Sequence, residues 1–152
     1  MDSKYTIISH QMLPSQANAA GNVHGGEIMK MMDSAAGVAA QRHAHSNAVT
    51  ARVDELNFKY PVFVGDFVIC KAHVIYVGSS SMEIFVTIET ENLITGESRV
   101  ALTAFFTMVA LDKDSHPIKV EKIECPDDPY ERALYYEGER RYKNSNKRKK
   151  FS

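Results

Sequence analysis

Tryptophan, disulfide-forming cysteines and long apolar runs are scarce or missing in this chain of 152 residues. Its two cysteines, Cys70 and Cys125, lie in a strand-like segment and in a connecting segment, so we expect free thiols. No apolar run approaches the roughly 20 residues of a membrane-spanning helix, and residues 1–10 lack the apolar core of a secretion signal. These absences exclude a disulfide-stabilised secreted domain and a helical membrane protein. We expect a soluble protein of the cytoplasm.

Acidic residues are absent from the C-terminal end, where residues 140–150 contain seven lysines or arginines. Because the net charge of the whole chain is −1, the remainder must be acidic. A basic end of this kind can bind nucleic acid, but no interleaved aromatic residues or known binding motif accompany it. We therefore expect a solvated, partly disordered end and no nucleic-acid partner.

The apolar residues follow two different periods, which indicates one long helix and a set of strands. Apolar residues make up 44% and charged residues 24%, which suits one globular domain that can bury a core. We expect a helix over residues 25–43, and strands over residues 5–13, 49–58, 67–77, 82–89 and 100–111. Short turns join the later strands, so these should pair antiparallel. The order predicts an α+β fold in which an antiparallel sheet wraps around one long helix, with an amphipathic segment over residues 130–142.

Asp33 is the unusual residue of the expected helix. At about 100° per residue, Glu27, Lys30, Ser34 and Gln41 form one narrow polar stripe, and Asp33 lies roughly 60° outside it. Its neighbours on the helical wheel are methionine, glycine and alanine, so the sequence predicts an acid in a largely apolar setting. Such an acid either pairs with a neighbouring backbone or arginine group or serves chemistry, and the pattern alone leaves both readings open.

Two glycines, Gly25 and Gly26, open the same helix. They leave the first backbone N–H groups bare, and such groups suit an anionic ligand or a developing oxyanion. Close packing or a flexible turn also requires glycine, so the pair is a weak signal by itself. Asp33 lies roughly 10 Å further along the helix axis, so only an extended substrate could bridge the two places.

An ordered motif runs through three segments, which read MLPSQANAAGNVHGGEIMKMMDSAAGVAAQRHA, RVDELNFKYPVFVGD and AFFTMVALD. The order of Asn, Gly, HGG and MD, and the spacing between them, resemble the acyl-CoA thioesterase family of hotdog-fold proteins, of the cytosolic acyl-CoA hydrolase type. The likeness spans roughly residues 5–120. The segment YERALYYEGERRY is similar to the C-terminal extension of such hydrolases.

This resemblance implies a hotdog fold over residues 1–125 and a helical extension with a basic end over residues 126–152. It also implies a dimer whose sheets join edge to edge, and a hexamer built as a trimer of dimers. The implied activity is hydrolysis of acyl-CoA to free acid and coenzyme A (CoA), with CoA as part of the substrate and no separate cofactor. The family's catalytic acid corresponds to Asp33, and its partner from the other subunit corresponds to Asn18.

A thioester suits a site with so few reactive groups. Its leaving thiolate, whose thiol has a pKa of about 8.5, needs no strong general acid. Asp33 is expected to act as the general base, with a direct nucleophilic role as the lesser option. Asn18 can orient the water or hold the carbonyl oxygen, and the N–H of Gly26 or its neighbour can stabilise the oxyanion. His24 either contacts the thioester end of the substrate or caps the helix.

The phosphates of CoA require donors and cations, and the sequence offers several. A turn whose hydroxyl and N–H groups can cradle an anion is formed by Gly78, Ser79, Ser80 and Ser81. In the family the matching turn approaches the CoA phosphates, although a plain hairpin turn is the alternative. Further candidates are Gly25, Arg99, Arg140 and Arg141.

Other functions are compatible with parts of the sequence. A hotdog dehydratase or hydratase would use a catalytic histidine with a carboxylate, and His24 with Asp33 could supply them. A non-catalytic acyl-CoA- or nucleotide-binding module would bind CoA without releasing a thiol. His43 and His45 form an H-x-H pair without a third suitably spaced ligand, so we expect no metal site.

Overall fold

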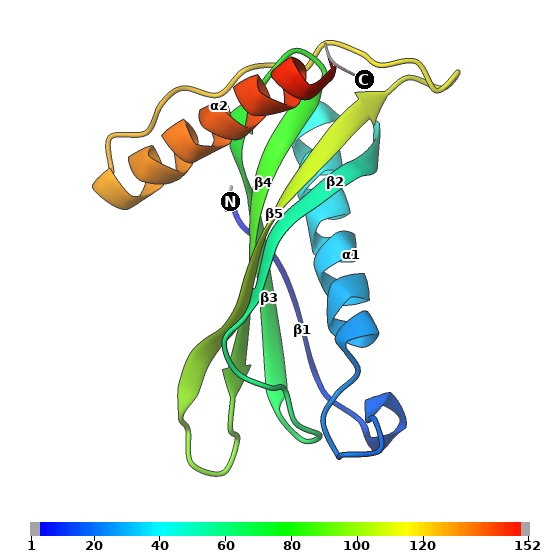
Figure 1. The fold of residues 1–152 in the computed structure, drawn as a ribbon, viewed down its shortest axis with the longest axis vertical. Coiled ribbons are helices and arrows are strands. Elements are labelled where there is room, and N and C mark those ends of the chain that lie inside the picture. Colours follow the sequence, from blue (N-terminus) through cyan, green and yellow to red (C-terminus); the bar gives the residue numbers. More distant parts are fainter. Residues whose placement is uncertain (1–3, 150–152) are drawn as a thin grey trace.

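A computed structural model describes residues 4–149 as one antiparallel sheet with a long helix on each face (Figure 1). The main elements are β1 (Thr6–Gln11), α1 (Gly25–Ala44), β2 (Asn47–Phe58), β3 (Phe67–Val77), β4 (Ser81–Glu91), β5 (Ser98–Leu111) and α2 (Pro129–Lys149). A short 3-10 helix, Pro14–Gln16, follows β1. The predicted α+β fold, with a sheet around one long helix, is confirmed.

The five strands follow the order β1-β3-β4-β5-β2, and all neighbours pair antiparallel. Side chains of the central strands alternate between the two faces of the sheet. The face toward α1 is apolar, and β4 contributes four fully buried residues to it: Met82, Ile84, Val86 and Ile88. Burying one such side chain stabilises the fold by about 1.5–3 kcal/mol, so this face is the main source of stability.

α1 packs closely on that face because most of its inward residues are small. Its buried residues are Ile28, Met31, Met32, Ala35, Ala36, Ala39 and Ala40. The polar stripe expected from the sequence faces solvent, with Lys30, Ser34 and Gln41 exposed. Because α1 contacts all five strands, packing fixes the direction in which each of its side chains points.

α2 crosses the opposite face of the sheet, where it contacts β3 and β4 (Figure 1). The contact is close at Gly138, since a Cβ built there would lie 2.6 Å from the Cβ of Tyr76. Nearer its start, Glu131 accepts a hydrogen bond from the Tyr5 hydroxyl at 2.9 Å and pairs with His73 Nε2 at 3.0 Å. These contacts tie the helix to β3 and to the segment before β1.

The helix continues to Lys149, so the expectation of a disordered basic end is wrong for residues 143–149. Lysine and arginine favour helices, and neither proline nor glycine follows Gly138 to interrupt the pattern. The rest of the predicted disordered end, residues 150–152, lies outside the described residues. Within residues 4–149, neither helix is long and apolar enough to cross a membrane.

β2 is a long edge strand of 12 residues, and its outer side is unpaired in the single chain. Three of its apolar side chains are largely exposed: Val49 by 43%, Leu56 by 40% and Phe58 by 50%. An open edge of this length is a template for pairing with another chain, and proteins that stay monomeric protect such edges. β2 is therefore a candidate surface for strand pairing between two copies.

The pair of His73 and Glu131 links the stability of the fold to pH. Burial lowers the pKa of His73 by more than the Glu131 carboxylate raises it. Burial also acts to raise the pKa of Glu131, but the donors Tyr5, Lys4 and His73 outweigh this effect and lower the pKa. Both groups therefore bind fewer protons in the folded protein than in the unfolded chain under acid conditions.

We predict that the free energy of unfolding falls when the pH is lowered from about 7 to about 5, and that His73→Gln flattens this dependence. The contribution of His73 is complete above its ordinary pKa of 6.5 and is lost as the pH falls below it. One proton changes the free energy by at most about 1.4 kcal/mol per pH unit. Urea unfolding at both pH values measures the slope, with exposed His10→Gln as the matched control. Equal slopes in wild type and His73→Gln would contradict the prediction.

Candidate active site

Asp33 lies on the side of α1 next to β2, where Thr50 donates its hydroxyl proton to the carboxylate. The distance from Thr50 Oγ1 to Asp33 Oδ1 is 2.5 Å, and the same hydroxyl lies 3.3 Å from Met108 Sδ. Asp33 is exposed, so the expectation of an acid in an apolar setting is wrong for the single chain. The reason is that the side chain points toward the edge strand and not into the core. Its Oδ2 atom has no hydrogen-bond partner in the described part of the chain.

Thr50 is a residue that sequence reasoning missed. In the sequence it is one of several polar residues that alternate with apolar ones along a strand. No local signal distinguishes it from Arg52 or Asp54, because its role depends on which strand packs beside Asp33. Only the tertiary pairing of α1 with β2 brings the two side chains together.

Asn18 lies in the loop before α1, with its carboxamide held in one orientation. Its Oδ1 atom accepts hydrogen bonds from the backbone N–H of Ala20 at 3.0 Å and of Asn22 at 3.1 Å. With the oxygen occupied, the two protons on Nδ2 are the groups that remain for a ligand. Asn18 lines a cavity of about 370 Å³ together with Asn22, Val23, Gly25, Ile28, Phe58, Lys59, Tyr60, Pro61 and Val62.

The first backbone N–H groups of α1 open beside the same cavity. The backbone N–H groups of Glu27 and Ile28 donate to the carbonyl of His24, while those of Gly25 and Gly26 have no partner within residues 4–149. A Cβ built on Gly26 would have no atom within 4 Å, so packing does not require glycine there. Open space in front of unpaired donors suits a bound anion or oxyanion.

His24 occupies the N-cap position of α1, but its side chain makes no capping hydrogen bond. The capping role considered from the sequence is therefore wrong. The ring is exposed beside Gly25 and Gly26, and contact with a substrate is the reading that stays open.

The turn from Gly78 to Ser81 joins β3 and β4. Its backbone is well ordered, since Gly78 N–H donates to the carbonyl of Ser81 at 2.9 Å. The carbonyls of Ser79 and Ser80 accept from Val120 and Ala110, each at 2.9 Å. None of the three serine hydroxyls has a hydrogen-bond partner among the described residues, so they are available to a ligand.

Of the three arginines expected to bind CoA phosphates, Arg99 lies on β5, and Arg140 and Arg141 are neighbours on α2. Arg99 stacks on the ring of Tyr60, with its guanidinium carbon 4.0 Å from the ring centre, and so lies beside the Asn18 cavity. Arg140 pairs with Glu137 at 2.6 Å on α2.

Arg141 is only 5% exposed, and its guanidinium is held by carboxylates on the sheet face that carries α2. It lies 2.8 Å from Glu55 and 3.0 Å from Glu137, and it stacks 3.8 Å from the ring centre of Phe105. These contacts attach α2 to β2 and β5, and they occupy the guanidinium that was expected to bind a phosphate.

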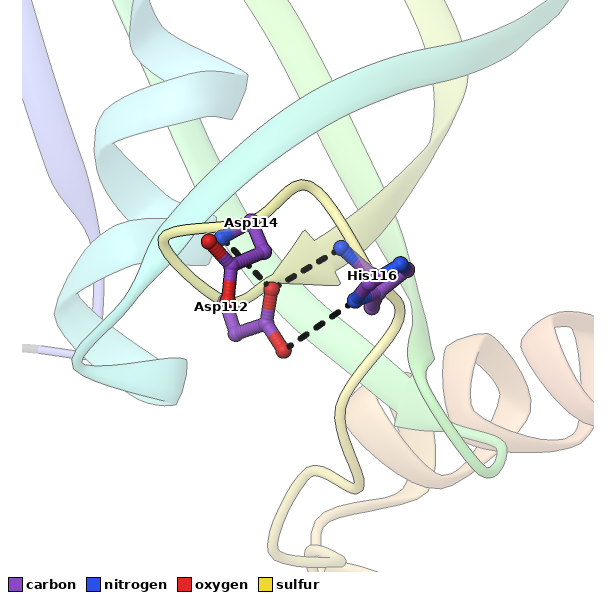
Figure 2. A group of neighbouring side chains, drawn as sticks. All are labelled: Asp112, Asp114 and His116. Atoms are coloured by element: carbon purple, nitrogen blue, oxygen red, sulfur yellow. Dashed lines mark hydrogen bonds and ion pairs between the residues drawn. The ribbon is translucent and has the colours of Figure 1, made fainter.

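Figure 2 shows Asp112, Asp114 and His116 in the turn that follows β5. Their ligand atoms lie within 4.8 Å of one another, a grouping that sequence spacing had not suggested. Asp112 Oδ1 accepts the N–H of Asp114 at 2.8 Å and of His116 at 2.9 Å. The carboxylate therefore closes the turn, and the group carries no further assignment.

The candidate catalytic residues form two groups at different heights along α1. Asp33 and Thr50 form one group, while Asn18 and Gly26 lie at the start of the helix. No hydrogen bond joins the two groups within residues 4–149. One chain thus presents a carboxylate at one place and hydrogen-bond donors at another, and both places border the exposed strand β2.

The chain matches known proteins along most of its length. The family model described as Thioesterase superfamily matches residues 20–97. YkhA of Bacillus subtilis, an uncharacterised acyl-CoA thioester hydrolase, is 34% identical over 96% of this chain and 84% of its own length. The cytosolic acyl coenzyme A thioester hydrolase of Rattus norvegicus is 34% identical over 88% of this chain. The match covers 35% of the rat protein, so this chain spans about a third of it.

Solved structures of acyl-CoA thioesterases and hydrolases are also similar to this chain. A hexameric acyl-CoA thioesterase superposes with a TM-score of 0.89 at 35% identity, over 95% of this chain and 92% of that one. An acyl-CoA hydrolase of Staphylococcus aureus, in complex with butyryl coenzyme A, coenzyme A and coenzyme A disulfide, has a TM-score of 0.87 at 29% identity, over 96% and 88%. Three similar structures of the S. aureus enzyme carry an aspartate, an asparagine or a threonine changed to alanine.

Family match, relatives and superposed structures thus agree with the geometry: the chain belongs to the thioesterase superfamily and has its hotdog fold.

Proposed function

We propose that this protein hydrolyses acyl-CoA thioesters to a free acid and CoA, with Asp33 as the general base. The observation that carries the proposal is the Asp33 carboxylate, held by Thr50 at an open sheet edge with its second oxygen unpaired. The relatives and solved structures named above, which are acyl-CoA hydrolases by name, supply the substrate class. The reaction needs water, a base and donors for the oxyanion, and we propose that it uses no cofactor.

The three altered positions of the S. aureus enzyme support this choice of residues. Their separations along that chain equal those between Asn18, Asp33 and Thr50 here. Two of the three were expected from the sequence, and the third is the threonine that the structure places against the carboxylate. The agreement of spacing and contact favours a site built from all three side chains.

We propose that two copies pair through β2 to complete each site. In an antiparallel pair of identical strands, the Thr50 end of one copy lies beside the Phe58 end of the other. Phe58 lines the cavity that contains Asn18 and Gly25. Pairing therefore places the Asp33 carboxylate of one subunit near the unpaired donors of the partner, which no single chain achieves.

The donors then hold the thioester while the carboxylate activates water. Asn18 Nδ2 and the N–H of Gly26 hold the carbonyl oxygen, since the Oδ1 atom of Asn18 is occupied by its own loop. Asp33 of the other subunit takes a proton from a water molecule, whose oxygen attacks the carbonyl carbon. The C–S bond breaks, and the proton passes to the leaving thiolate. Direct attack by the Asp33 carboxylate is the lesser alternative.

The relatives also bear on the larger assembly and the location. A hexameric structural neighbour supports a hexamer, and we propose that it is a trimer of the β2-paired dimers. The rat relative, which is cytosolic by name, supports a cytoplasmic location.

Asp33→Asn should reduce kcat on acyl-CoA by about 100-fold or more, because the amide cannot take a proton from water. The control is Ser34→Ala, a change at the adjacent exposed position, which should keep wild-type turnover. Thiol release from a series of short to long acyl-CoA esters measures both variants, and size-exclusion chromatography confirms the assembly. Wild-type turnover by Asp33→Asn on every ester would refute the mechanism.

A mixture of Asp33→Ala and Asn18→Ala chains should recover activity that neither variant has alone. Each mixed dimer contains one site with both native side chains and one site with neither. Random mixing therefore restores about a quarter of wild-type activity if the site spans the β2 interface. The chains are mixed after mild denaturation and refolding, with each variant refolded separately as the control. Absence of recovery, with mixed dimers detected by mass spectrometry, would place each site within one chain.

Thr50→Val should lower kcat by about 10-fold, because the carboxylate loses the hydrogen bond that orients it. Thr50→Ser keeps the hydroxyl and should retain most of the activity. The KM for acyl-CoA should change little in either variant, since Thr50 acts through Asp33. Equal activity of the Val and Ser variants would show that the hydroxyl is not needed.

A further inference from the structure

Lys122 lies beside the Gly78–Ser81 turn, outside the segment matched by the family model. We propose that its ammonium group binds a phosphate of the CoA portion and so makes the enzyme prefer CoA esters over esters of thiols without phosphates. The inference rests on the proposed hydrolysis of acyl-CoA. It adds to that proposal a residue which sets substrate preference.

Hydrogen bonds hold the backbone of the residues that directly precede Lys122. Ile118 N–H donates to the carbonyl of Ala110 at 3.0 Å, and Val120 N–H donates to that of Ser79 at 2.9 Å. The carbonyl of Glu121 lies 2.7 Å from His43 Nε2 at the end of α1. Lys122 is thus part of an anchored segment and does not lie on a free loop.

The ammonium group itself is directed at the turn. Lys122 Nζ donates to the carbonyl of Gly78 at 3.3 Å. An ammonium has three protons, so this contact leaves two for another acceptor. Lys122 forms no ion pair in the described part of the chain, and its charge is therefore available to an anion.

The turn adds neutral donors to this charge. The hydroxyls of Ser79, Ser80 and Ser81 have no partner within residues 4–149, as described above. The backbone N–H groups of Ser79 and Ser80 also have no hydrogen-bond partner in the same range. Hydroxyls, backbone N–H groups and one cation around a turn match the requirements of a phosphate group.

α2 packs against the turn through the ring of Tyr142. A Cβ built on Gly78 would lie 2.0 Å from an atom of the Tyr142 ring, so the ring packs directly on the Gly78 backbone. Tyr142 also contacts the ring of Tyr76, with ring centres 5.7 Å apart. The C-terminal helix therefore packs on the turn at Gly78, the residue whose carbonyl accepts the Lys122 hydrogen bond.

The turn lies within reach of Asp33. Thr50, which holds Asp33, pairs with Met108 on β5, and Met108 pairs with Met82 on β4. Met82 follows Ser81 directly, so the turn begins about two strand spacings, roughly 10 Å, from Thr50. The extended pantetheine arm of CoA, which separates the thioester from the diphosphate, is long enough to cover this span.

The test compares two substrates with the same acyl group, one an ester of CoA and the other an ester of pantetheine, which has no phosphate. Lys122→Met should raise KM for the CoA ester by about 10-fold or more, as expected for the loss of one charge-assisted hydrogen bond. The kcat for both esters and the KM for the pantetheine ester should not change. Lys122→Arg should restore most of the lost affinity, and exposed Lys119→Met is the matched control.

Three results would overturn the proposal: unchanged KM for the CoA ester in Lys122→Met, equal changes for both esters, or the same effect in Lys119→Met. Thermal unfolding of each variant shows whether the fold is intact. A failure of the proposed function is distinguishable, because the wild-type enzyme would then release thiol from neither ester.

Discussion

The packing of α1 against the apolar face of the sheet is the contact on which the arrangement of functional groups depends. Small residues along the helix, such as Ala36 and Ala40, allow it to lie close to the strands, and the contact reaches all five of them. This packing fixes both the height and the direction of Asp33. It also fixes the start of the helix, where the N–H groups of Gly25 and Gly26 have no partner within residues 4–149 and Gly25 lines the Asn18 cavity. A shift of the helix by one turn would separate the carboxylate from Thr50.

The two faces of the sheet differ in their side chains and in the helix that packs on them. The inner face is apolar and supports the helix that carries Asp33. The outer face carries polar and aromatic side chains, and buried His73 and Arg141 are each held there by carboxylates that connect the sheet to α2. These ionic and aromatic contacts fix the position of α2 on the sheet. The helix can therefore hold the Gly78 turn in a defined position. The C-terminal extension therefore belongs to the same unit as the site and does not form a separate module.

The sequence was sufficient to predict the main helices and strands and some residues of the candidate site. A nearly continuous apolar run located β3 at its observed bounds, and the helix predicted over residues 25–43 is observed as Gly25–Ala44, because both signals are local. Asn18, Asp33 and the glycines came from a motif with defined spacing. Thr50 could not be found in this way, because its contact joins two elements whose packing no local pattern encodes.

The wrong expectations have the same physical origin. Arg141 was expected at a phosphate because it is basic, but three-dimensional packing brings Glu55 and Glu137 to its guanidinium. The basic end was expected to be disordered because of its charge, yet its intrinsic helix preference extends α2 to Lys149. Asp33 was expected in an apolar setting because the wheel shows only its own helix and not the open edge beside it.

The unpaired edge of β2 has a consequence for how activity responds to protein concentration. In the proposed β2-paired dimer, half of each site comes from either copy, so an isolated chain would have no complete site and would be inactive. Mass action then makes specific activity fall on dilution below the dissociation constant of the pair, while substrate that bridges both copies favours their association. The cellular concentration of the protein would thus determine the activity of each chain, and not only the number of active chains.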